Sequence, residues 1–254
     1  MDLLIDIGNT NLRWTTRDPE VPAPAGEGAL LGPMAGVRHH GALPIDLLAA
    51  WDQLDPPARV LVGNVGGDDL AEHLTRTTRS LWGIEPRFAV PQAQAFGVRV
   101  AYAEPTRLGV DRWLALIAAH HQGPGAALIV DAGTAITYDL LLADGQHLGG
   151  LILPGVHLMR ETLLGRTRIP PVSSPTDPDP GTPWATDTAT AIAGASLQAP
   201  AALAERLWQN LCDQVGDNPR LILTGGDAEY LAPLIQVPAH LQPALVLQGL
   251  ALAF

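Results

Sequence analysis

The chain has 254 residues, of which 47% are hydrophobic and 16% are charged, and its formal net charge is −11. This composition is typical of a globular protein, and the length suits one large domain or two small ones. All 15 basic residues are arginine, which excludes sites built on a lysine, such as a Walker A loop or a Schiff base. Nucleic acid is not expected as a partner, because binding it needs a basic face.

The first half of the chain begins with a buried strand at residues 3–7. A Pro- and Gly-rich stretch at residues 19–41 predicts short irregular strands and turns. Apolar residues at helical spacing then predict a helix over residues 44–54. The elements predicted after it are a strand at 59–63, a helix through Leu70 and Leu81, short strands at 87–90 and 98–102, and a helix at 111–122.

The second half repeats this order. Strands at residues 127–131, 135–142 and 147–153 predict a meander, with Asp144-Gly145 as a hairpin turn, and a helix begins at Pro154. The proline-rich residues 170–183 form either a lid or a surface loop. The elements predicted after them are a long helical region from Thr188 that is interrupted at Pro200, a strand at 220–224 and two short helical stretches.

Two of these strands end in nearly the same sequence, half a chain apart. Leu-Leu-Ile-Asp-Ile-Gly-Asn-Thr stands at residues 3–10 and Leu-Ile-Val-Asp-Ala-Gly-Thr-Ala at residues 128–135, so that Asp6 aligns with Asp131. Such a turn can present backbone N–H groups to phosphate, with a carboxylate beside it for a cation. A strand followed by Asp-x-Gly is common by itself, but the pair at half-chain spacing favours two phosphate turns.

No apolar run reaches the ~20 residues that a membrane-spanning helix needs. The chain opens with Met1-Asp2-Leu3, directly at the first strand and without the basic segment of a secretory signal. We therefore expect a cytoplasmic protein that has no membrane partner. The one cysteine, Cys212, cannot form an internal disulfide or a thiolate metal site.

The order of motifs resembles the type III pantothenate kinases, bacterial enzymes of coenzyme A biosynthesis. The resemblance covers nearly the whole chain, and its most specific part is a Gly-x-Asp-Arg helix start between the two Asp-x-Gly turns. The matching motifs are Asp6-Ile7-Gly8-Asn9-Thr10, Tyr102 and Pro105 with Gly109-Val110-Asp111-Arg112, Asp131-Ala132-Gly133-Thr134, residues 149–155, and Thr224-Gly225-Gly226.

This resemblance implies the duplicated ribonuclease-H-like fold that acetate kinase, sugar kinases and actin share. We expect an α/β protein of two mixed-sheet domains, residues 1–122 and 123–254, with an interdomain cleft. The implied activity is ATP-dependent phosphorylation of pantothenate to 4′-phosphopantothenate. The resemblance also implies Mg²⁺ with ATP, a monovalent cation (potassium or ammonium), and a homodimer whose pantothenate pocket is completed near the subunit interface.

Phosphoryl transfer needs charge neutralisation on the phosphates and a hydroxyl held in line. Gly8 lets the backbone approach the phosphates, and Asp6 is expected to hold Mg²⁺, directly or through water. Asp131 is a second cation carboxylate, and the resemblance assigns the monovalent ion to it. Arg13 stands where the family often has lysine, so it either contacts phosphate or lies at the surface. The predicted ATP- and phosphate-binding residues are Asp6, Ile7, Gly8, Asn9, Thr10, Asn11, Leu12, Arg13 and Thr134.

Asp111 is the predicted general base, which accepts the proton of the pantothenate hydroxyl and typically contributes ~10²–10⁴ in rate. It also suits an N-cap. Arg112 is expected to pair with the pantothenate carboxylate or a phosphate, or to form a surface ion pair. Thr188 resembles the family's threonine substrate contact, although Ala185 replaces the glycine expected before it. The predicted substrate-binding residues are Tyr102, Gly109, Val110, Asp111, Arg112 and Thr188.

The histidine pairs at residues 39–40 and 120–121 are predicted to be solvated, because no acidic residue or cysteine stands at ligand spacing. His157 remains unassigned. Two other functions stay open. Another small-molecule kinase of this fold would share the two turns but not the arrangement of Tyr102 with Asp111 and Arg112. A regulatory protein similar to Bvg accessory factors is the other alternative, although the acidic charge argues against direct DNA binding.

Overall fold

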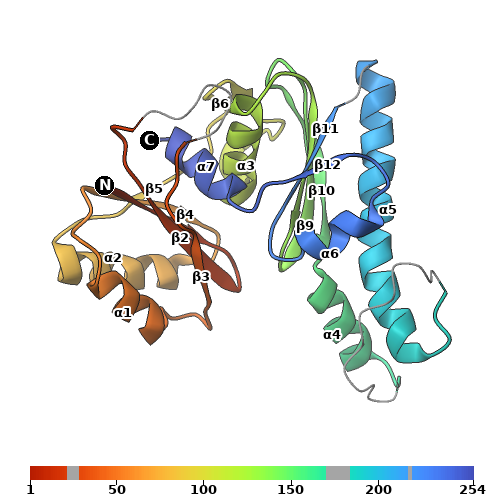
Figure 1. Cartoon of the computed structure of the whole chain (residues 1–254), viewed down its shortest axis with the longest axis horizontal. Helices are drawn as coiled ribbons and strands as arrows, with labels where there is room; N and C mark the ends of the chain where they lie inside the picture. Colours follow the sequence, from red (N-terminus) through yellow and green to blue (C-terminus); the bar gives the residue numbers. More distant parts are fainter. Residues whose placement is uncertain (22–28, 170–183, 217–218) are drawn as a thin grey trace. The chain divides into compact units, whose positions relative to one another are not determined.

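The computed structural model of the chain describes residues 1–21, 29–169, 184–216 and 219–254, which are traced in Figure 1. The predicted lid or loop at residues 170–183 lies outside them. Internal contacts define two compact units. Unit 1 consists of Met1–Pro124, Asp144–His147 and Ala244–Phe254, and unit 2 of Gly125–Ala143 and Leu148–Pro243.

Unit 1 is built on a five-stranded mixed sheet in the order β3-β2-β1-β4-β5. The first three strands form an antiparallel meander, and β4 and β5 lie parallel beside β1. Parallel neighbours need a crossover connection, which α2 supplies between β4 and β5. The strand bounds are β1 Asp2–Ile7, β2 Asn11–Arg17, β3 Ala35–Arg38, β4 Arg59–Asn64 and β5 Arg87–Phe88.

Helices cover both faces of this sheet (Figure 1). Helices α1 and α2 pack on the face of Leu3, Ile5 and Ile7, which share a hydrophobic core with Trp51 and Leu74. Since side chains alternate along a strand, the remaining residues of β1 face the other way, toward α3 and α7. The bounds are α1 Ile45–Asp52, α2 Asp68–Trp82, α3 Val110–His121 and α7 Leu245–Leu252, with the short elements β6 Gln94–Ala95, β7 Val98–Arg99 and η1 Pro105–Arg107.

Unit 2 repeats this topology with a sheet in the order β10-β9-β8-β11-β12. Strand β9 is antiparallel to β8, and β11 and β12 continue parallel on the other side. The duplicated ribonuclease-H-like fold predicted from the sequence is confirmed, whereas the cleft between the domains stays a prediction. The bounds are β8 Ala127–Ala132, β9 Ala135–Leu141, β10 His147–Pro154, α4 Val156–Arg166, α5 Thr188–Val215, β11 Arg220–Thr224, α6 Ala228–Leu231, η2 Ala232–Leu234 and β12 Ala239–Leu241.

The long helix α5 is continuous through Pro200, so the predicted interruption there is wrong. Proline removes one N–H from the helix ladder and crowds the preceding turn. Packing on the sheet compensates for this loss, because Pro200 is buried and its carbonyl accepts a hydrogen bond from the Tyr138 hydroxyl at 3.0 Å. Burial raises the pKa of Tyr138, which keeps that hydroxyl a donor.

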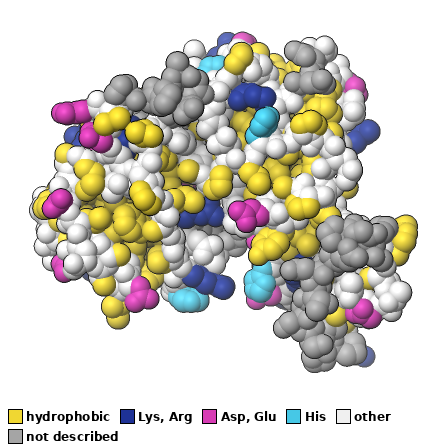
Figure 2. Space-filling model, viewed as in Figure 1, with side chains coloured by type: hydrophobic (Ala, Val, Ile, Leu, Met, Phe, Trp, Pro, Cys, Tyr) yellow, Lys and Arg dark blue, Asp and Glu magenta, His cyan; other side chains and the backbone are white. Residues whose placement is uncertain are grey.

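The surface shows no long basic stripe on the face drawn in Figure 2, where arginine side chains lie singly among acidic, apolar and polar ones. Within the described ranges, no helix combines the length and the apolar character that crossing a bilayer requires.

The end of the chain is attached to unit 1 by an ion cluster at the start of β1. Asp2 is fully buried, and its carboxylate accepts hydrogen bonds from Arg17 Nη2 at 3.0 Å and Arg59 Nε at 2.9 Å. The same two guanidinium groups donate to the carbonyls of Ala251 and Phe254, where the helix dipole favours cations. Contacts therefore group α7 with unit 1, whereas the division at residues 122 and 123, which stays a prediction, places it in the second half.

Burial of the Asp2 carboxyl acts to raise its pKa, but the hydrogen bonds from Arg59 and Arg17 outweigh burial and hold that pKa below its ordinary value. A carboxyl whose pKa is lowered by folding stabilises the fold above its unfolded pKa. That stabilisation is lost as the pH falls through the folded pKa.

We expect Asp2→Asn to lower the free energy of unfolding by about 2–3 kcal/mol at pH 7, the range for hydrogen bonds to a charged group. As the pH falls from the ordinary aspartate value of 3.8 through the lower pKa of the folded carboxyl, the difference from wild type should shrink, because the unfolded chain binds this proton first. Urea unfolding at neutral and acidic pH measures both values. Asp55→Asn, at an exposed carboxylate, is the control and should change neither. A difference that is the same at both pH values would contradict the assignment.

Candidate active site

The two Asp-x-Gly segments occupy equivalent places in the two sheets. Asp6 and Asp131 are the second-to-last residues of β1 and β8, and each is the partly exposed member of an otherwise buried strand. Asp6 pairs with Gly63 of the parallel strand β4, and Asp131 pairs with Thr224 of the parallel strand β11. Both carboxylates therefore stand at the carboxyl ends of parallel strands, where open α/β sheets bind ligands.

The first turn follows β1 and is closed by the Gly8 N–H, which donates to the Asn11 carbonyl at 2.9 Å. A Cβ at Gly8 would lie 3.1 Å from that oxygen, so glycine suits this close turn. Of the predicted phosphate-binding residues, Asn9 and Asn11 are exposed and Thr10 is half-buried. The side chains of Ile7 and Leu12 are fully buried, so only their backbone could face a ligand.

Arg13 lies directly opposite Asp6 in the β1–β2 register. Directly opposed residues share one face of a sheet, so this arginine stands on the same face as the Asp6 carboxylate. It is half-buried rather than fully exposed. This position favours a role for Arg13 near the first turn over the alternative that it is only a surface residue.

The second turn, after β8, is enclosed by the glycines of the later motifs. The Gly155 N–H donates to the Thr134 carbonyl at 2.9 Å, and the Asp227 N–H donates to the Ala132 carbonyl at 2.9 Å. A Cβ at Gly155 would lie 2.1 Å from the Gly133 oxygen. Gly225 has a φ of +93°, and a Cβ there would lie 2.3 Å from the Ala132 oxygen. No larger residue fits at either glycine.

The oxygen atoms around both aspartates are suitable ligands for hard cations. Asp131 is half-buried, and its Oδ1 would lie only 2.5 Å from a Cβ at Gly225, so it sits among backbone oxygens of the turn. Carboxylate and carbonyl oxygens are ligands for hard cations, and Mg²⁺ is commonly bound by one carboxylate together with substrate phosphates. In the parts of the chain that the structure describes, no three His, Cys, Asp or Glu side chains gather as a metal site.

Helix α3 approaches the end of β1 because Gly63 has no side chain. A Cβ at Gly63 would lie 2.9 Å from Leu114 Cδ1 and 3.9 Å from Asp6 Oδ1. Asp111 precedes Leu114 by three residues, and residues three apart share a helix face. Asp111 therefore lies one turn nearer the start of α3, on the face that packs on Gly63, the β4 neighbour of Asp6.

Asp111 is half-buried in the first turn of α3, where the helix dipole favours a carboxylate. Its Oδ1 accepts the N–H of Arg112 at 2.8 Å. The N-cap residue is Gly109, not Asp111, and a Cβ there would lie 2.5 Å from Asp111 Oδ1. Any side chain at position 109 would therefore collide with the Asp111 carboxylate. Val110, the first residue of the helix, is buried.

Arg112 is buried and is not the surface residue of the alternative interpretation, since only 6% of it is exposed. Its Nη1 donates to the Tyr102 hydroxyl at 2.9 Å, and its Cζ lies 5.8 Å from the centre of the Tyr102 ring. The His147 ring stacks on Tyr102 with a centroid distance of 6.4 Å and is fully buried. These three side chains form one group, in which Arg112 and His147 are buried and Tyr102 is half-buried.

Sequence reasoning missed His147, which follows the β9–β10 hairpin turn and has no local signal for this contact. The hairpin is held in unit 1 by Arg99, whose Nη2 contacts Asp144 Oδ2 at 2.9 Å and whose N–H donates to the Gly145 carbonyl at 2.9 Å. His147 Nδ1 in turn accepts the Ala101 N–H at 3.4 Å. Only this tertiary placement brings His147 to Tyr102.

Thr188 is the first residue of α5 and is exposed. The neighbouring Asp187 caps the helix by accepting the Thr190 N–H at 3.0 Å and its hydroxyl at 2.7 Å, and these hydrogen bonds lower the pKa of Asp187. Thr188 belongs to unit 2, whereas Tyr102 and Asp111 belong to unit 1. Its contact with substrate stays a prediction.

The prediction of solvated histidines is wrong for His39, which is 5% exposed and contacts the first turn. His40 and His121 are exposed and His120 is half-buried. Burial of His39 follows from a tertiary contact with the Gly8 carbonyl, which no local pattern reveals.

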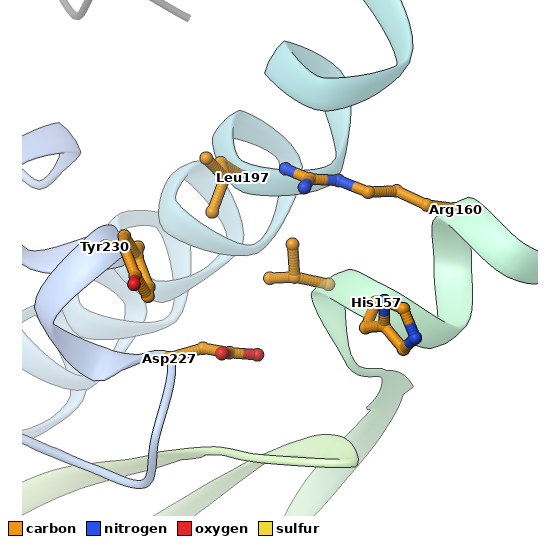
Figure 3. A pocket seen from close by; sticks show the side chains of 6 residues that line it. His157, Arg160, Leu197, Asp227 and Tyr230 are labelled. Atoms are coloured by element: carbon orange, nitrogen blue, oxygen red, sulfur yellow. The ribbon is translucent and has the colours of Figure 1, made fainter. Parts of the chain in front are cut away.

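Unit 2 contains a pocket of about 230 Å³ beside the second turn. In Figure 3, His157 and Arg160 of α4 face Asp227 and Tyr230 across it, with Leu197 of α5 behind. Arg160 is held by Ser196, to whose Oγ its Nε donates at 2.7 Å. The pocket adjoins the turn because two of its lining residues are tied to it: Asp227 donates its N–H to the Ala132 carbonyl, and Val156 follows Gly155, which donates to the Thr134 carbonyl.

A duplicated ribonuclease-H-like fold with an Asp-x-Gly turn at each central strand defines a class of nucleotide-dependent phosphotransferases. Within this class, the family model described as type III pantothenate kinase matches residues 2–210, and the chain belongs to that family. Proteins named type III pantothenate kinase from Nitrosococcus oceani and an Azoarcus species are 36% and 38% identical to it. The alignments cover 99% of this chain in both cases, and 92% and 89% of those proteins.

A solved Campylobacter jejuni structure, described as a conserved Baf family transcriptional activator, resembles the chain with a TM-score of 0.55 and 19% identity. The likeness covers 97% of this chain and 94% of that one, and it shows the fold alone. The family and the activity predicted from the motifs are confirmed: the chain is a kinase that phosphorylates pantothenate in coenzyme A biosynthesis, using ATP with Mg²⁺.

Proposed function

We propose that this chain transfers the γ-phosphoryl group of ATP to the primary hydroxyl of pantothenate with Asp111 as the general base. The placement of Asp111 carries the proposal. Its carboxylate stands in the first turn of α3, on the face that meets Asp6 across Gly63. A base at this position can accept the hydroxyl proton next to the turn that holds the phosphates.

The first turn and Asp6 serve the transferred phosphate in this proposal. The exposed Asn9 and Asn11 and the half-buried Thr10 offer hydrogen-bond donors, and Arg13 adds positive charge from the opposite strand. Asp6 holds Mg²⁺, directly or through water; when bound with ATP, this ion neutralises the phosphate oxygens. Thr134 on the second turn is a further hydrogen-bond donor to the phosphates.

Arg112 and Tyr102 bind pantothenate. A guanidinium group is planar and pairs with carboxylates in two parallel hydrogen bonds, which suits the pantothenate carboxylate. The hydrogen bond to Tyr102 fixes the orientation of Arg112, and His147 in turn packs on Tyr102. Thr188 is a further contact with pantothenate, as the family resemblance implies.

The pocket beside the second turn receives the nucleoside part of ATP. It is next to the turn assigned to phosphate, and it combines apolar walls at Val156 and Leu197 with polar groups at Arg160, Asp227 and Tyr230. Ligand sites likewise combine apolar surface with polar groups that fix the orientation of the ligand.

Three further features belong to the same proposal. Asp131 holds a monovalent cation, potassium or ammonium, beside the second turn. The protein acts as a homodimer in the cytoplasm, with the pantothenate pocket completed near the subunit interface. The family resemblance supports each of these, together with the oxygen donors around Asp131.

Two alternatives are weaker. Another small-molecule kinase of this fold would not need the buried pairing of Arg112 with Tyr102. A regulatory role finds a parallel in the name of the Campylobacter protein, but the net charge of −11 opposes direct DNA binding.

Asp111→Asn should leave folding near normal and lower turnover by at least ~100-fold, because the amide cannot accept the hydroxyl proton. Steady-state kinetics and thermal unfolding measure both quantities. Asp69→Asn is a matched control, since Asp69 is likewise the second residue of a helix with a glycine N-cap. Turnover like that of wild type in the Asp111 variant would overturn the assignment.

The purified protein should form 4′-phosphopantothenate from ATP and pantothenate, and more rapidly with potassium than with sodium. In Asp131→Ala this potassium response should disappear, or activity should be lost altogether, because the carboxylate ligand is removed. Product formation with each salt, followed by chromatography, tests this. An unchanged potassium response would place the cation elsewhere, and no product from wild type would favour the regulatory alternative.

Tyr230→Ala should raise the KM for ATP at least about fivefold, since stacking of a base on an aromatic ring is worth ~1–3 kcal/mol. The KM for pantothenate should not change. Tyr230→Phe keeps the ring and serves as the control, with kinetics near those of wild type. A rise in the KM for pantothenate instead of ATP would show that the pocket does not hold the nucleoside.

A further inference from the structure

His39 makes three hydrogen bonds beside the first turn. Its backbone N–H donates to the Thr10 carbonyl at 2.9 Å, and its Nε2 contacts the Gly8 carbonyl oxygen at 2.9 Å. Since a carbonyl only accepts, Nε2 must carry the hydrogen. The other ring nitrogen, Nδ1, accepts the Gly41 N–H at 3.4 Å. With both ring nitrogens bound to backbone, the imidazole has a structural task and is not placed to transfer a proton.

The duplication shows that this contact is a special feature of the first half. His39 directly follows β3, the last strand of the first meander, and Gly155 directly follows β10, the last strand of the second. Each donates its N–H at 2.9 Å to the carbonyl of a threonine in the turn, Thr10 or Thr134. His39 and Gly155 therefore occupy equivalent positions in the two halves.

The two turns differ in length, and this explains the difference in side chain. Residues 8–11 separate the paired Ile7 and Leu12, whereas only residues 133–135 separate the paired Ala132 and Ile136. In the shorter turn a Cβ at Gly155 would lie 2.1 Å from the Gly133 oxygen. The longer turn leaves room for a side chain, and the imidazole of His39 binds the equivalent oxygen, that of Gly8.

This contact determines where the next amide points. The chain has no cis peptide bonds in its described parts, and in a planar trans peptide the C=O and the following N–H point in opposite directions. The hydrogen bond from His39 to the Gly8 carbonyl therefore turns the Asn9 N–H away from His39. A longer loop has more conformations to lose, so such a constraint matters more in the first turn than in the second.

We infer that His39 is a positioning residue for ATP: it binds the Gly8 carbonyl and thereby holds the Asn9 amide toward the phosphates. The inference rests on the proposed function, in which the first turn binds the ATP phosphates. It concerns affinity for ATP and not for pantothenate, because the side-chain hydrogen bonds of His39 go to Gly8 and Gly41, whereas Arg112 bonds to Tyr102.

Two variants of similar length separate hydrogen bonding from packing. His39→Gln retains an N–H donor near the place of Nε2, whereas His39→Met removes it. We expect Met to raise the KM for ATP about tenfold, the factor that corresponds to ~1.4 kcal/mol, with the KM for pantothenate unchanged. Gln should restore most of the loss. His40→Met, at the exposed neighbour, is the control and should behave as wild type.

Calorimetric titration with Mg·ATP gives the affinity without turnover, and thermal unfolding of each variant checks the fold. If wild type binds ATP but makes no phosphopantothenate, the proposed function fails, and the binding constants of the variants still decide the role of His39. The inference is overturned if the Met and Gln variants bind ATP equally well. It is also overturned if both substrates lose affinity to the same extent, which is the pattern of a purely structural residue.

Discussion

The active site depends on how closely the backbone packs around the turns that end the two central strands. Around the second turn, the main chain at Gly155 and Gly225 approaches carbonyl oxygens so closely that a Cβ would lie 2.1 Å and 2.3 Å from them. Side chains cannot supply such short approaches, and bound carbonyls fix the peptide planes that carry the neighbouring N–H groups. In a chain without lysine, amides oriented in this way are suited to the phosphate binding that a charged side chain provides elsewhere.

The two halves share a topology but have diverged at the site. Asp6 and Asp131 occupy the same position in strands with the same burial pattern, yet their surroundings differ. Asp6 faces Arg13 across the meander and meets α3 across Gly63, whereas Asp131 is pressed against Gly225. The first carboxylate therefore stands beside an arginine and α3, and the second beside backbone oxygens of its own turn. A duplicated sheet with unequal turns thus gives the two aspartates unlike surroundings.

Much of the fold could be predicted from local sequence. Strand β1, the strands of the second meander and the helices at residues 68–82 and 110–121 follow from apolar runs and periodicity, and the repeated sequence around Asp6 and Asp131 reveals the duplication. Strand β2 was not predicted, because its partly buried residues lack clear alternation. The continuity of α5 through Pro200 and the attachment of α7 to unit 1 depend on tertiary packing, by the Tyr138 hydroxyl and the Asp2 cluster. The same limit hides His39 and His147, since a histidine beside a carbonyl or a ring has no local signature.

The arginines show how a chain without lysine fixes positive charge in place. A guanidinium group hydrogen-bonds in a plane, so its partners determine the direction in which it can bind. Tyr102 fixes Arg112, Asp2 fixes Arg17, and Ser196 fixes Arg160. A lysine ammonium at the same places would be a mobile point charge that makes the same contacts in many rotamers. Because the orientation of Arg112 is set before substrate arrives, little side-chain entropy is lost when it pairs with a carboxylate. If Arg112 binds the pantothenate carboxylate as proposed, Tyr102 and His147 behind it contribute to that binding through the orientation of the arginine.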